Sequence, residues 1–162
     1  MSILWEELTL GLLDAKQLQR LFIRVLAATL LGAAIGFQRE RAGKPAGLRT
    51  HTLVSLGTTL LILSCSAAGM SLDALSRVIQ GIITGIGFIG AGSILKLSGE
   101  HAIRGLTTSA SIWVTAALGV AVGLGSVGIA ALSTFLALII LALVGRLEHK
   151  LEKQKQMGTE ED

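Results

Sequence analysis

Residues 105–145 contain no charged side chain, and this feature does most to limit how the chain can fold. A helix needs about 20 largely apolar residues to cross a hydrocarbon core of roughly 30 Å. The uncharged run is twice that length, so it must fold back on itself. The stretch "GLGS" at residues 123–126 lies at its midpoint and supplies a flexible turn. The run therefore predicts two membrane-spanning helices.

Three more stretches have the length and apolarity of a membrane span, at residues 18–37, 50–70 and 77–95. The whole chain is 51% hydrophobic and only 15% charged, with a mean hydropathy of +0.70, which is too apolar for a soluble domain of 162 residues. We therefore predict an all-α, polytopic membrane protein with about five transmembrane helices over residues 18–145.

The two ends of the chain differ from this central region. Residues 1–17 lack the basic start and cleavage site of a secretory signal and place Trp5, Leu8 and Leu12 at helical spacing. They predict either a short helix in the membrane interface or a frayed terminus. Residues 146–162 read as a charged cytoplasmic tail.

The distribution of Lys and Arg predicts the orientation. Ten of the 14 basic residues fall in the connections around residues 38–49 and 96–104 and in the tail, all on one side of the predicted bundle. Basic connections stay in the cytoplasm. We expect the N-terminus outside and the C-terminus in the cytoplasm.

The segment "GIGFIGAG" at residues 85–92 contains the G-x-G-x-x-G spacing of a dinucleotide site. It lies inside an apolar run and lacks the acidic residue expected about 20 positions later, so the nucleotide reading fails. Close helix packing through small residues is favoured over a loosened helix that lines a cavity with its carbonyls. The packing glycines would be Gly81, Gly85, Gly87, Gly90 and Gly92.

Few polar groups fall at membrane depth: Gln80 and Thr84 in the third span, and hydroxyls that include Thr107 and Thr108 in the fourth. No carboxylate falls there, and the three histidines are far apart in sequence, so we expect no metal site and no cofactor. No arrangement of nucleophile and base suggests an enzyme, and nothing indicates nucleic-acid binding.

The first cytoplasmic connection is the richest in charge. We expect a loop, broken by Gly43, Pro45 and Gly47, and two readings of it stay open. Charge alone would anchor it to anionic membrane lipids. Alternatively, guanidinium groups with an internal carboxylate would bind an anion or an acidic protein partner. The candidate residues are Arg39, Glu40, Arg41, Lys44, Arg49, Thr50 and His51.

Four ordered motifs between about residues 20 and 145 resemble the membrane domain of the bacterial MgtC/SapB family. They are "LLGAAIGFQRERAGKPAGLRTHTLVSLG", the pair Asp73 and Arg77, "GIGFIGAGSILK", and "RGLTTSASIWVTAALGVAVGLG". The resemblance implies a protein of the bacterial inner membrane. It also directs attention to Gly105, Thr107 and Thr108 as site residues, beside the basic connection and the glycines already named.

The family is associated with growth in low magnesium, acid tolerance and virulence, and some members are reported to restrain the ATP synthase. The resemblance therefore implies a non-enzymatic regulator, here expected as a homo-oligomer; the alternative is a transporter or channel whose pathway forms between protomers. Two departures stand out. Gln38 occupies a position that is usually acidic in the family, and we expect no soluble C-terminal domain.

Overall fold

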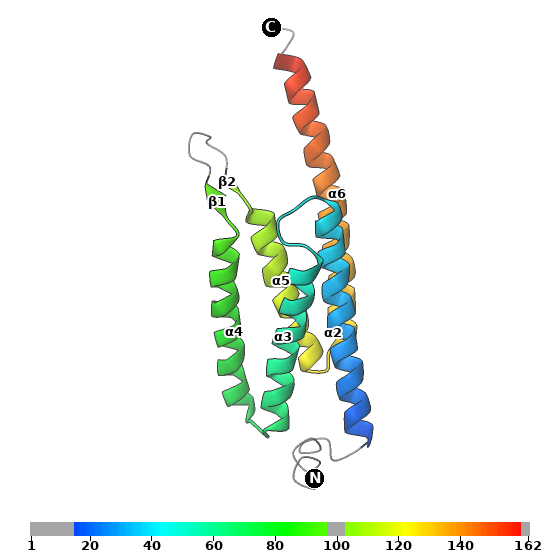
Figure 1. Cartoon of the computed structure of the whole chain (residues 1–162), viewed down its shortest axis with the longest axis vertical. Coiled ribbons are helices and arrows are strands. Elements are labelled where there is room, and N and C mark those ends of the chain that lie inside the picture. The colour runs from blue at the N-terminus through cyan, green and yellow to red at the C-terminus, as the bar shows by residue number, and fades with distance from the viewer. Residues whose placement is uncertain (1–14, 97–102, 160–162) are drawn as a thin grey trace.

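The structure is a computed structural model that describes residues 15–96 and 103–159. Within these residues, five helices run alternately up and down, and a short hairpin interrupts them (Figure 1). The elements are α2 (Ala15–Arg41), α3 (Leu48–Ala67), α4 (Leu72–Gly92), β1 (Leu95–Lys96), β2 (Ile103–Arg104), α5 (Leu106–Gly123) and α6 (Val127–Thr159). The predicted interfacial helix falls in residues 1–17, of which 1–14 lie outside the described residues.

The all-α prediction is confirmed, apart from the two-residue strands β1 and β2, which pair antiparallel. Four helices, α2 to α5, are long and apolar enough to cross a membrane, and α6 contributes a shorter apolar stretch at Val127–Leu143. The predicted reversal near residue 125 is also confirmed. Gly125 has a φ of 92°, a left-handed conformation that glycine adopts without a Cβ clash, and it joins α5 to α6.

We call one end of the bundle the loop end. It holds the turn at residues 42–47, the β1–β2 hairpin and the C-terminal part of α6 (Figure 1). The turns at residues 68–71 and 124–126 lie at the opposite end. This arrangement confirms that the three basic segments of the sequence share one end.

Only the middle of the predicted loop around residues 38–49 is a loop, because its two ends are helical, and this corrects the sequence interpretation. Helix α2 continues to Arg41 and α3 begins at Leu48, so Arg39 and Glu40 are helical and Lys44 is the one candidate residue in the turn itself. The segment "FQRER" contains Gln, Arg and Glu, which are good helix formers, and the chain leaves the helix only where Gly43 takes a φ of 64°.

Helix α3 packs between α2 and α5, while α4 lies at the edge of the bundle against α5 (Figure 1). One apolar cluster joins α3, α4 and α5 through Ile62, Ile82 and Ile112. A second joins α2, α5 and α6 through Ile35 and Val122. Large apolar side chains also cover the outside of the helices, as lipid requires; Leu53, Phe88 and Phe135 are examples.

Glycines do allow close helix packing, but mostly not the predicted ones. A Cβ on Gly32 or Gly36 of α2 would collide with α3, and one on Gly119 or Gly123 of α5 would also collide with α3. Of the predicted glycines, Gly90 alone meets a neighbour, the side chain of Ser109. A Cβ would meet nothing within 4 Å at the other four positions, Gly81, Gly85, Gly87 and Gly92. The packing prediction is wrong for these four within one chain, because they lie on the side of α4 turned away from α5.

Candidate functional site

The candidate site lies at the loop end, where the end of α2, the turn and the start of α3 meet the start of α5. Arg39 is the centre of the site. It is only 3% exposed, although it stands in the last turn of α2. Its Nη2 donates a 2.8 Å hydrogen bond to Oγ1 of Thr108 on α5. Within the described part of the chain, no carboxylate pairs with this guanidinium, and its Nε is buried without a protein acceptor.

His51, in the first turn of α3, is fully buried beside Arg39. Its Nδ1 lies 3.0 Å from the carbonyl oxygen of Gly47, and because a carbonyl only accepts, Nδ1 carries a hydrogen. Its Nε2 lies 3.1 Å from Oγ of Ser111, which also lies 2.8 Å from the carbonyl oxygen of Thr108. In a neutral ring Nε2 accepts, so the single Ser111 hydroxyl hydrogen is shared between two acceptors.

Glu40 links α2 to α3 across the turn. Its Oε2 accepts a 2.9 Å hydrogen bond from the backbone nitrogen of Leu48, the first residue of α3. A carboxylate at a helix N-terminus satisfies an otherwise unpaired N–H and interacts favourably with the helix dipole. The turn is tightened further by backbone bonds from Gly43 to the Glu40 carbonyl and from Lys44 to the Arg39 carbonyl. The turn is therefore held in one conformation.

Three cations of the candidate set remain exposed around this turn: Arg41, Lys44 and Arg49. Arg41 lies over the ring of Phe37, with 5.0 Å from its guanidinium carbon to the ring centroid. Among the residues the structure describes, none of the three has a carboxylate within ion-pair distance. The loop end thus presents a positive surface on a fixed backbone.

The remaining candidates take no part in the side-chain hydrogen bonds of this site, although Thr50, Gly105 and Thr107 are its neighbours in the chain. Thr50 is half-buried and Thr107 is exposed, while Gly105 packs against the backbone carbonyl of Ser93. Asp73 and Arg77 form a 2.8 Å ion pair at the opposite end of the bundle, in the first turns of α4. Gln80 and Thr84 lie exposed on α4.

The structure also gives buried or bonded positions to polar side chains that the sequence analysis did not propose as site residues. Arg24 donates from Nη1 to the carbonyl oxygen of Gly123 at 3.1 Å and so caps the C-terminus of α5. Inside the bundle, three more side-chain atoms are buried without a protein partner: Gln38 Oε1, Thr52 Oγ1 and Ser55 Oγ. The sequence could have indicated the hydroxyls of α3, because Thr52, Ser55 and Thr59 are spaced by three and four residues and so lie on one face of that helix.

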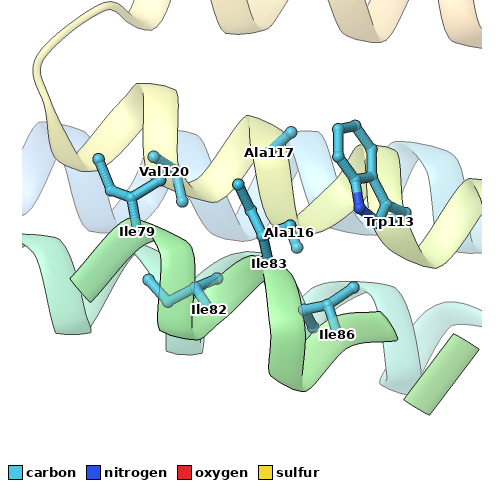
Figure 2. Close-up of a pocket in the computed structure, with 8 residues that line it drawn as sticks. All are labelled: Ile79, Ile82, Ile83, Ile86, Trp113, Ala116, Ala117 and Val120. Atoms are coloured by element: carbon cyan, nitrogen blue, oxygen red, sulfur yellow. The ribbon is translucent and has the colours of Figure 1, made fainter. Parts of the chain in front are cut away.

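The groove between α4 and α5 has a different character. Figure 2 shows isoleucines of α4 facing Trp113 and small residues of α5. The space between them has a volume of about 120 Å³. No charged or hydrogen-bonding group other than the Trp113 indole belongs to its lining, so it is unsuited to an ion. No cluster of three His, Cys, Asp or Glu side chains that could hold a metal ion occurs among the described residues.

Comparison with known proteins decides the family. The sequence profile of the MgtC family matches residues 25–150, which cover most of α2, all of α3 to α5, most of α6 and all of the candidate site. The chain belongs to the MgtC family. Its apolar helices and this membership make it a multi-pass membrane protein. No solved structure matches this MgtC-family chain.

Several MgtC-family relatives are close in sequence. Protein SrpB of Synechococcus elongatus is 45% identical over 139 residues, which are 79% of this chain and 76% of SrpB. "Putative magnesium transporter YhiD" of Escherichia coli is 39% identical over 80% of this chain and 62% of YhiD. Protein MgtC of Brucella abortus is 43% identical over 78% of this chain and 52% of that protein. The match therefore spans from about half to three quarters of these relatives.

Proposed function

We propose that this MgtC-family chain is a non-enzymatic regulator of a membrane partner in the bacterial inner membrane, acting in adaptation to magnesium or acid stress. The observation that carries the proposal is the exposed cationic surface of Arg41, Lys44 and Arg49. These residues surround a turn that is fixed by hydrogen bonds of Arg39, Glu40 and His51. A fixed array of guanidinium groups recognises carboxylates through paired hydrogen bonds, which suits an acidic protein surface.

The proposed orientation places this surface in the cytoplasm, because the loop end holds most of the Lys and Arg residues. The family resemblance makes the membrane part of the ATP synthase one candidate partner.

Complementation of a deletion strain under low-magnesium or acid stress tests the proposal. Changing both Arg41 and Arg49 to Lys keeps the charge but removes the planar fork, so we expect activity to fall while membrane levels stay normal. Arg20→Lys, at the opposite end of α2, is the matched control and should complement fully. If the double Lys variant also complements fully, the surface serves as a lipid anchor and the specific partner site is refuted.

The alternative function is transport of an ion or small solute. It is favoured by the buried, unpaired polar atoms of Gln38, Thr52 and Ser55 inside the bundle and by the name of the relative YhiD, which calls that protein a "Putative magnesium transporter". Flux measured in liposomes containing the purified protein separates the two functions. The regulatory proposal predicts no flux above empty liposomes, whereas flux that falls in a Ser55→Ala variant would favour transport.

A further inference from the structure

One face of α4 points away from the rest of the bundle, and we call it the outer face. Its residues recur at intervals of four and three, so they form a straight stripe along the helix. They are Asp73, Arg77, Gln80, Thr84, Gly87 and Ala91, and all are exposed. The buried residues of α4, such as Ile82 and Ile86, lie on the opposite side.

The outer face is unusual because it carries polar groups at membrane depth. Gln80 lies about 12 Å along the helix from Leu72, at a rise of 1.5 Å per residue, and Thr84 lies about 18 Å along it. The Thr84 hydroxyl donates to the Gln80 carbonyl oxygen at 2.9 Å and is satisfied within the helix. The Gln80 side-chain amide bonds to no described residue, and an unpaired amide in hydrocarbon is costly.

The exposed sides of the other helices differ from this face. Those of α2 and α6 present large apolar side chains, such as Phe22 and Phe135, which suit contact with lipid. Helix α4 also exposes large apolar side chains, but these lie outside the stripe: Ile83, Phe88 and Ile89. Helix α4 is also less covered by its own chain than the other candidate spans: 17% of the residues in its most apolar stretch are buried, against 50% in α5. Both observations indicate that another protein surface covers the outer face.

We infer that the outer face of α4 pairs with the same face of a second copy of this chain. Copies inserted in one orientation are related by a two-fold axis along the membrane normal, so the two α4 helices run parallel. The stripe then repeats every seven residues, the spacing of two helices that supercoil around each other. Each Gln80 amide can both donate to and accept from the other Gln80.

The two ends of the stripe fit this pairing. Asp73 and Arg77 carry opposite charges one turn apart on the same face, and a two-fold axis brings the carboxylate of each copy near the guanidinium of the other. Gly87 and Ala91 at the other end have little or no side chain, so the two backbones can approach closely. The face is therefore complementary to itself along its length.

Disulfide crosslinking in native membranes tests the pairing. A Cys65→Ala background removes the single native cysteine, and Thr84→Cys, Ile83→Cys and Gly85→Cys are then compared at nearly the same depth. All three positions are exposed, but Thr84 alone lies on the outer face. We expect several-fold more crosslinked dimer for Thr84→Cys than for its neighbours. Crosslinking that is absent at Thr84, or equal at all three positions, would refute the inference; absence would point to lipid or a different protein on this face.

Energy transfer between two labelled copies in liposomes gives a second, independent measurement. Gln80→Leu removes the amide from an exposed position, so the monomer should still fold while the dimer signal falls several-fold. Gln80→Asn keeps an amide at the same place and should retain most of the signal. Undiminished transfer in Gln80→Leu would show that the amide does not hold the two copies together.

Discussion

The guanidinium of Arg39 donates from Nη2 to the hydroxyl of Thr108 over a distance of 2.8 Å, joining residues 69 positions apart in the chain. The bond ties the end of α2 to the first turn of α5. The side chain of Arg39 is only 3% exposed, so it cannot be part of a docking surface together with the exposed cations around it. Arg39 thus shapes the site, while Arg41, Lys44 and Arg49 form its surface.

Replacing Thr108 with Val should destabilise the bundle. The variant keeps the shape of the side chain but removes the acceptor from a buried cationic donor, which costs about 1–3 kcal/mol. Thermal unfolding in detergent measures the loss. Thr108→Ser keeps the hydroxyl and should lie much closer to wild type, and equal stability of the Val and Ser variants would mean that the bond contributes nothing.

Glu40 should act as an N-terminal cap of α3 through its oxygen as well as its charge. Glu40→Ala removes the acceptor for the Leu48 nitrogen and should cost about 0.5–2 kcal/mol, the usual range for a lost cap. Glu40→Gln keeps a side-chain oxygen and should lose less. Hydrogen exchange at the start of α3 reports the effect locally, and unchanged protection in the Ala variant would contradict the capping role.

The glycines of α4 and α5 should respond differently to the same small change. Gly119→Ala places a methyl group against the Thr58 hydroxyl and the Ser55 carbonyl and should cost about 1–3 kcal/mol by overpacking. Gly85→Ala meets open space and should be neutral or slightly stabilising, because Ala favours the helix. Thermal stability of the two variants, measured side by side, decides whether close packing lies in α5 or in α4.

The orientation of the bundle can be tested with two reporters. A reporter fused after Met157 should read as cytoplasmic, and one inserted after Gly69, in the turn between α3 and α4, should read as external. The opposite pair of results would place the cationic surface outside and remove the basis for a cytoplasmic partner.

The sequence by itself determined the number and approximate position of the helices. Hydrophobic length is a local property, and an uncharged run of twice the membrane thickness admits only a reversal, which occurs at Gly125. The number of helices also predicts that the basic segments share one end, because successive spans cross the membrane in alternating directions. The family was also readable from ordered motifs, since these do not depend on contacts between distant residues.

Only the tertiary structure decided which polar residues and which glycines meet. The sequence pattern of α4 does not distinguish Gly90, which packs against α5, from Gly85, which meets no neighbour. Which glycine packs depends on where α5 lies. In the same way, nothing local to "QRER" separates buried Arg39 from exposed Arg41. They stand two residues apart on a helix, about 200° around its axis, and only the side facing Thr108 is covered.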